Sequence, residues 1–220
     1  MTVSKPSKNP EPMWPTLVAL AAAGGLFAAL PDNLALGPRW LVLAVVAGLL
    51  IPAEACHFIG RHNLCRILGY VVISIVTVTM IGSVMLLLHA IEQRSIHPIT
   101  LLQSASTLWI TNILVFAVWY WRLDAGGPHK RSLRETHTHE HGAFLFPQMT
   151  MPELPDQTPD LDNWAPVFVD YLFLAFNTST ALSPTDVPVL SRWAKSLMMI
   201  QASISLVIIV LLAARAVNIL

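Results

Sequence analysis

Long uncharged apolar runs constrain this chain more than any other feature. A bilayer core about 30 Å thick is crossed by about 20 helical residues, and most of the runs reach or approach that length. Hydrophobic residues make up 55% of the chain and charged residues only 12%, well below the roughly 25% charged residues of a soluble domain. We therefore predict an all-α, polytopic membrane protein. The runs cover residues 14–30, 40–53, 67–91, 99–121 and 197–214.

The first run is expected to remain as a transmembrane helix. It is long, and no small-residue cleavage site follows it, so it is unlike a secretory signal. The second run becomes long enough if its helix continues past Glu54 into residues 56–58.

One hydrophilic stretch divides the chain into three predicted parts. Residues 1–121 form a four-helix transmembrane region, residues 122–163 a hydrophilic loop, and residues 164–220 a short helix, a polar turn and a terminal transmembrane helix. Pro184 and Pro188 end the apolar stretch that begins at residue 164, because proline cannot continue a helix from within. The pattern predicts five spans plus a re-entrant half-helix, or six spans.

The distribution of lysine and arginine predicts the orientation of the spans. Cytoplasmic loops carry an excess of these residues, and a cytoplasmic N-terminus puts eight of them inside and two outside. The loop 122–163 is then cytoplasmic. The eight are Lys5, Lys8, Arg61, Arg66, Arg122, Lys130, Arg131 and Arg134, and the two are Arg39 and Arg94.

The stretch Phe-Asn-Thr-Ser-Thr-Ala-Leu-Ser-Pro-Thr-Asp-Val-Pro, residues 176–188, follows the order of a pore loop. Potassium filters use backbone carbonyls, and their glycines allow dihedral angles that other residues avoid. Pro184 fixes its own dihedral angle here and restrains Ser183, which excludes a potassium-selective filter. A weakly selective cation path remains as the prediction. Its candidate residues are Thr178, Thr180, Ser183 and Asp186.

Four stretches carry a resemblance to known proteins. They are Trp119-Tyr-Trp-Arg-Leu-Asp-Ala-Gly-Gly-Pro, Phe144-Leu-Phe-Pro-Gln, and residues 170–187 with the ending Ala216-Val-Asn-Ile-Leu. Over roughly its C-terminal half, the chain resembles a family of bacterial polytopic membrane proteins that has no assigned activity. The resemblance implies a multi-pass protein of the bacterial inner membrane. More distantly, the C-terminal part is similar to the two-helix pore module of potassium-channel-like ion channels, with a degenerate filter, and no filter residue is carried over.

Histidines in the hydrophilic loop are candidate metal ligands. His137, His139 and His141 alternate, so on an extended strand they would point the same way and share one ion, as short histidine-rich tracts do. A solvated loop without metal is the alternative. A second set, Glu54, Cys56, His57, His62 and Cys65, matches no familiar zinc spacing, and its cysteines could instead be buried as small hydrophobic residues.

Polar residues within the apolar runs are predicted to pair or to line a wet path. Asp170 is a lone acid, and an ionisable residue inside the membrane suggests a functional site. Arg215 is its predicted partner if the two helices pack side by side, and otherwise each lies at a membrane surface, where Arg215 would snorkel. Interhelical hydrogen bonds or a wet path are expected for Thr107, Thr111, Asn112, Gln201, Ser203 and Ser205.

These features favour a channel-like or transport-related membrane protein. No nucleophile–base pair or cofactor motif is present, so we expect neither an enzyme nor a cofactor, and the zero formal charge gives no reason to expect nucleic acid. The expected partners are the lipid bilayer, a cation and further copies of the chain, because small residues at 19–29 permit close helix approach. The alternative is a non-conducting scaffold whose histidine-rich loop binds a partner or a metal.

Overall fold

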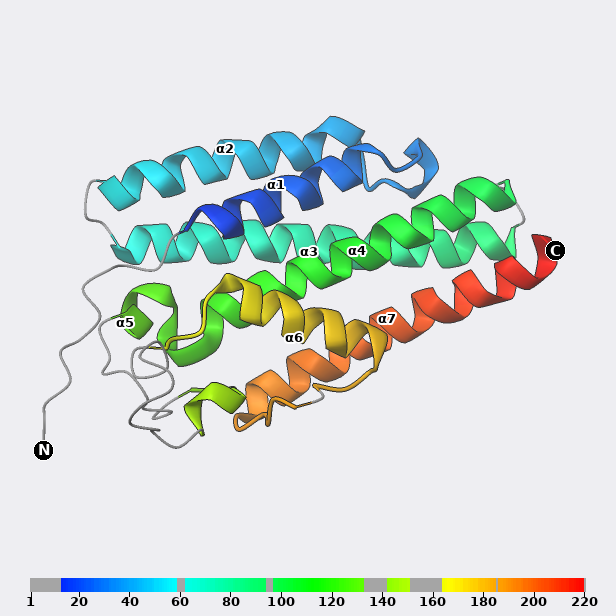
Figure 1. The fold of residues 1–220 in the computed structure, drawn as a ribbon. Helices are drawn as coiled ribbons and strands as arrows, with labels where there is room; N and C mark the ends of the chain where they lie inside the picture. The colour runs from blue at the N-terminus through cyan, green and yellow to red at the C-terminus, as the bar shows by residue number, and fades with distance from the viewer. Residues whose placement is uncertain are drawn as a thin grey trace, which may run out of the picture. The chain divides into compact units, whose positions relative to one another are not determined.

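The computed structural model describes residues 13–58, 62–93, 97–132, 142–150, 164–184 and 186–219. Over these residues the chain is helical, and the only strand-like feature among them is one isolated bridge between Phe144 and Val189. The prediction of an all-α protein is confirmed. The α-helices are α1 (Trp14–Ala28), α2 (Arg39–Phe58), α3 (His62–Glu92), α4 (Pro98–Leu123), α5 (Pro128–Ser132), α6 (Phe168–Thr180) and α7 (Arg192–Ile219), shown in Figure 1. The 3-10 helices are η1 (Asp32–Leu34), η2 (Asp124–Gly126) and η3 (Pro147–Met149).

Three helical stretches of the described residues are long and apolar enough to cross a membrane. They are Arg66–Glu92, Pro98–Gly126 and Arg192–Ala214. The apolar helices Trp14–Ala28 and Trp40–Leu49 are shorter. The chain is thus a membrane protein with transmembrane helices.

The chain separates into two compact units. The C-terminal unit consists of Met1–Pro15 and Phe116–Ala202, and the N-terminal unit consists of Thr16–Val115 and Ser203–Leu220. The helices α4 and α7 each contribute to both units.

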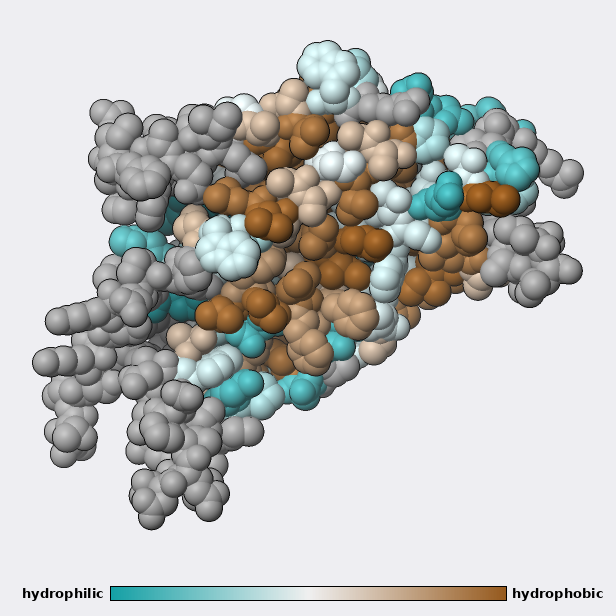
Figure 2. Space-filling model, turned by 45° about the horizontal axis from the view of Figure 1, so that its top comes forward, coloured by the Kyte–Doolittle hydropathy of each residue, from teal (hydrophilic) through white to brown (hydrophobic). Residues whose placement is uncertain are grey.

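Apolar faces at helical spacing build the core of the N-terminal unit. In α3 the buried side chains include Val72, Val76 and Met80, whereas Val78 and Met85 are 66% and 61% exposed. This spacing gives α3 one face for the protein and one for lipid. Hydrophobic side chains, drawn in brown, accordingly form much of the exposed surface in Figure 2.

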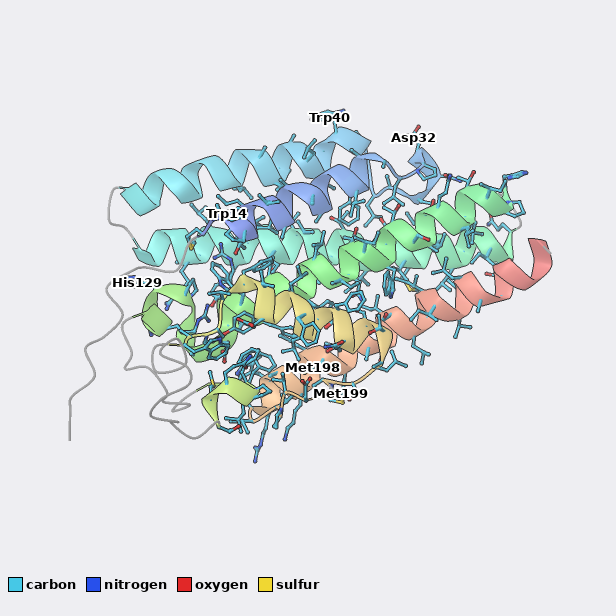
Figure 3. All side chains as sticks on the ribbon, in the orientation of Figure 1. Trp14, Asp32, Trp40, His129, Met198 and Met199 are labelled. Carbon is cyan, nitrogen blue, oxygen red and sulfur yellow. The ribbon has the colours of Figure 1, made fainter. Side chains whose placement is uncertain are left out.

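Close packing in the same unit involves a glycine of α1. A Cβ atom at Gly24 would lie 3.1 Å from Cδ1 of Leu43 in α2. Helix α2 in turn packs along α3. Trp40, near the start of α2, is 65% exposed and points outward in Figure 3.

Aromatic side chains form much of the core of the C-terminal unit. The ring of Phe144 is fully buried and lies 5.3 Å from Tyr120, 6.2 Å from Tyr171 and 6.1 Å from Trp193, between ring centroids. These three partners belong to α4, α6 and α7. The segment 142–150 is therefore packed among these three helices.

Candidate functional site

The helix α6 is shorter than a bilayer core is thick. It has 13 residues, which gives a length of about 20 Å against a bilayer core of about 30 Å. Its last turn closes with a hydrogen bond from the Ala181 amide to the Asn177 carbonyl of 2.8 Å. Leu182 then takes a positive φ of 55°, the left-handed conformation that commonly ends a helix. The chain reverses at this point.

A buried carboxyl group fixes the start of α6 to the end of α4. The hydroxyl of Tyr171 donates to Oδ2 of Asp124 at 2.6 Å, and the amide of Ala143 donates to Oδ1 at 2.6 Å. Asp124 is 1% exposed. Arg131 donates to the carbonyl oxygens of Trp121 and Asp124 at 3.1 and 3.2 Å. Its guanidinium also lies 5.0 Å from the centroid of the Tyr171 ring, so α6 begins where α4 ends.

The segment that returns from α6 to α7 ends beside Ala143, the residue whose amide binds Asp124. Residues 188–190 pair with residues 143–145 through two backbone hydrogen bonds, from the Leu145 amide to the Pro188 carbonyl at 3.0 Å and from the Leu190 amide to the Ala143 carbonyl at 2.8 Å. Ala143 thus binds Asp124 through its amide and Leu190 through its carbonyl. Figure 1 shows the chain running out along α6 and back to the start of α7.

The second half of α6 is attached to the first half of α7 by the side chain of Gln201. Gln201 is fully buried, and its amide nitrogen donates to the Ala175 carbonyl at 2.7 Å and to the Ser179 hydroxyl at 2.8 Å. Gln201 lies nine positions after Arg192, the first residue of α7, which corresponds to about 14 Å along the helix. Measured along the axis of α7, the end of α6 therefore lies about half the thickness of a bilayer core from the start of α7.

The four predicted pore residues lie at the end of α6 and in the return segment. Thr178 is 1% exposed, and its hydroxyl donates to the Leu174 carbonyl of its own helix at 2.8 Å. Thr180 is exposed and donates to the Phe176 carbonyl at 2.9 Å. Ser183 is half-buried and Asp186 is exposed. The structure brings the four into one short stretch, with Thr180 and Asp186 as its exposed polar residues.

The predicted pairing of Asp170 with Arg215 is not described, because the structure does not describe the side chain of Arg215. Asp170 is the third residue of α6, and its Oδ2 accepts a hydrogen bond from the Val167 amide at 2.8 Å. Burial raises the pKa of Asp170 from its ordinary value, although the Val167 amide and the charge of Arg131 act in the opposite direction. The pairing stays a prediction.

The predicted metal ligands fall outside the part of the chain that the structure describes. This holds for His137, His139 and His141, and for the side chains of Glu54, Cys56, His57, His62 and Cys65. Among the side chains that are described, no group of three histidine, cysteine or acidic residues could hold a metal ion. His129 is exposed on α5 (Figure 3).

Sequence reasoning found part of this site. Gln201 and Ser205 were predicted to bond between helices, and they do: Gln201 binds α6, and Ser205 accepts from the Trp109 indole at 3.0 Å. The hydroxyl of Thr111 instead donates to the Thr107 carbonyl of its own helix at 2.8 Å. Asp124 was missed because an acid after an apolar run, followed by Ala-Gly-Gly-Pro, is typical of a loop. In comparisons with protein-family models, curated proteins and solved structures, the chain has no significant match.

Proposed function

We propose that α6, its turn and the return segment form a re-entrant pore loop, and that copies of the chain assemble into a weakly selective cation pathway in a bacterial inner membrane. One observation carries the proposal. Ala143 bonds to Asp124, which holds the start of α6 through Tyr171, and it also bonds to Leu190 just before α7. The Asp124 carboxyl at the end of α4 thus binds the start of α6 directly and the segment before α7 through Ala143, which supports a hairpin that enters and leaves on one side.

The length of α6 and the position of its far end support the same topology. A helix of about 20 Å whose end lies about 14 Å along α7 reaches the middle of a bilayer and turns back. The proposed topology is then five spans and a half-helix, with the shorter apolar helices Trp14–Ala28 and Trp40–Leu49 counted among the spans. With this topology Arg192 and Lys195 join the eight predicted cytoplasmic cations, and Arg215, at the other end of the last span, joins the two outside, which makes ten against three. Six spans would put Arg192 and Lys195 outside and Arg215 inside, which makes nine against four, so the five-span topology fits the positive-inside rule better.

The chemistry of the turn favours a cation over an anion. The carboxyl end of α6 carries the negative end of the helix dipole, and Thr180 and Asp186 are exposed beside it. A ring of acids attracts cations whatever their size. Potassium selection is not expected, because Pro184 lacks a backbone donor and restricts the carbonyl geometry that a filter needs. The pathway is therefore predicted to pass both sodium and potassium.

Ion flux into liposomes tests this function. Purified protein should pass potassium and sodium at similar rates, and Asp186→Asn should lower both fluxes several-fold because it removes the charge that concentrates cations. The control is Asp32→Asn, since Asp32 is an exposed acid of η1 in the N-terminal unit. Strong potassium selectivity, or flux unchanged by Asp186→Asn, would contradict the proposal. Absence of flux would favour the non-conducting scaffold.

A further inference from the structure

We infer that the lipid bilayer is thinned beside the hairpin of α1 and α2, so that its surface follows the loop between these helices rather than the end of α3. This α1–α2 loop is residues 29–38. The partner is phospholipid, with its headgroups at the loop. The inference concerns helices of the N-terminal unit and does not rest on the proposed pore loop.

A glycine of α3 fixes the depth of the α1–α2 loop. A Cβ atom at Gly82 would collide with the side chain of Leu36, and η1 also packs against α3. Gly82 lies ten residues before Glu92, where the candidate span Arg66–Glu92 ends, which corresponds to about 15 Å along the helix. Figure 1 accordingly shows α3 continuing past the loop.

The part of α3 beyond Gly82 is as apolar as the rest of the span. Residues 83–91 include no lysine, arginine or acidic residue. Met85 is 61% exposed within this part, whereas Leu87 is buried. An exposed apolar side chain on an uncharged helical stretch is stable in hydrocarbon. The hydrocarbon region around α3 therefore reaches toward Glu92 and does not end at Gly82.

The α1–α2 loop itself cannot lie in hydrocarbon. It is irregular apart from the three residues of η1, and Asp32 and Asn33 are exposed. Irregular backbone at membrane depth occurs only where protein or water surrounds it, and an exposed acid in hydrocarbon is costly. The loop therefore requires a polar environment about 15 Å along α3 from the level of Glu92.

Trp40 indicates that this environment is the headgroup region of the bilayer. It is the second residue of α2, follows Arg39, is 65% exposed and points outward in Figure 3. Tryptophan is enriched at membrane–water interfaces, where its ring lies at the level of the headgroups. Leu41 and Leu43 follow it and are 40% and 39% exposed, as side chains just inside the hydrocarbon would be.

The apolar length of α2 agrees with a thinned bilayer. Its uncharged run covers residues 40–53, between Arg39 and Glu54, and is about 20 Å long against a bilayer core of about 30 Å. A span shorter than the bilayer is accommodated by local thinning. The uncharged run of α3, residues 67–91, is about 37 Å long. The bilayer surface therefore slopes from the level of Glu92 to that of Trp40.

Quenching by labelled lipids tests this surface in the full chain. Asn33→Cys, Gln93→Cys and Ser74→Cys are made singly in a background with Cys56→Ser and Cys65→Ser, labelled with bimane and reconstituted in liposomes of eighteen-carbon phospholipids. The lipids carry a spin label either on the headgroup or deep in an acyl chain. Positions 33 and 93 should be quenched about twofold more by the headgroup label. Position 74, exposed on α3 eight residues before Gly82, is the control and should show the reverse.

Three outcomes would overturn the inference. Stronger quenching of position 33 by the acyl-chain label would place the loop in hydrocarbon. Quenching of position 93 by aqueous iodide but by neither lipid label would mean a flat bilayer that ends near Gly82. Quenching of position 33 by neither lipid label would mean that water or another protein, and not lipid, borders the loop. None of these results depends on ion flux, so the pore loop and the thinned bilayer can fail separately.

Discussion

The hydroxyl oxygen of Tyr120 lies 2.5 Å from Oε1 of Gln201, and both side chains are fully buried. The amide nitrogen of the same glutamine donates to the Ala175 carbonyl and the Ser179 hydroxyl. One side chain therefore joins α4, α6 and α7 within the C-terminal unit. In the proposed topology this cross-link holds the inner end of the re-entrant helix at its depth.

Gln201→Leu is expected to lower the free energy of unfolding by about 2–3 kcal/mol, because it removes the buried hydrogen bonds of Gln201 to Tyr120, Ala175 and Ser179. Unfolding in mixed micelles with rising SDS, followed by tryptophan fluorescence, measures the change. The double variant Tyr120→Phe, Gln201→Leu should be less destabilised than the sum of its single variants, since it removes both ends of one hydrogen bond. Met199→Leu is the exposed control on the same helix. A loss no larger than that of the control would show that the cross-link contributes nothing.

Asp124 and Tyr171 should be energetically coupled by about 1–3 kcal/mol, the range for buried hydrogen bonds to carboxyl groups. Asp124→Asn, Tyr171→Phe and the double variant form a double-mutant cycle that measures this coupling in the same unfolding assay. The comparison cycle pairs Asp124→Asn with Thr180→Val, at the opposite end of α6, and its effects should add. Additive effects in both cycles would contradict the proposed attachment of α6 to the end of α4.

Gly127→Ala should destabilise the protein by about 1–2 kcal/mol. Gly127 has a φ of 94°, and a Cβ atom there would lie 3.1 Å from the carbonyl oxygen of Arg122. Gly25→Ala is the matched substitution in a helix interior, where a Cβ atom would meet nothing within 4 Å. It should stabilise α1 by up to about 1 kcal/mol, since alanine is the better helix former. The same direction of change in both variants would contradict this account of the turn after α4.

The sequence predicts the helices better than it predicts the contacts between them. The apolar stretch from residue 164 predicted a helix before Pro184, either a re-entrant half-helix or a sixth span, and α6 begins at Phe168 and ends at Thr180. Its end follows from Leu182, whose left-handed conformation no local pattern indicates. The bonds of Asp124 to Tyr171 and Ala143 span 47 and 19 residues, and such distant pairs leave no periodic signal.

The final prediction separates a re-entrant α6 from a sixth span by the side on which α7 begins. Single cysteines are placed at Ser132, at Ser191 and at Asp32, in a background with Cys56→Ser and Cys65→Ser. If α6 re-enters, the positions 132 and 191 are both cytoplasmic, and labelling them in intact cells requires a membrane-permeant maleimide. Position 32, in η1 between the first two helices, should react with an impermeant maleimide.

Permeabilised cells provide the control, since all three positions should then react with the impermeant reagent. Impermeant labelling of position 191 but not 132 in intact cells would mean that α6 crosses the membrane, in spite of its 13 residues. Labelling of both, with position 32 protected, would invert the protein and make the loop enter from outside. We expect the impermeant maleimide to label position 32 in intact cells and to leave positions 132 and 191 unlabelled. The reason is that the two hydrogen bonds of Ala143 link the end of α4, where α6 begins, to the segment just before α7.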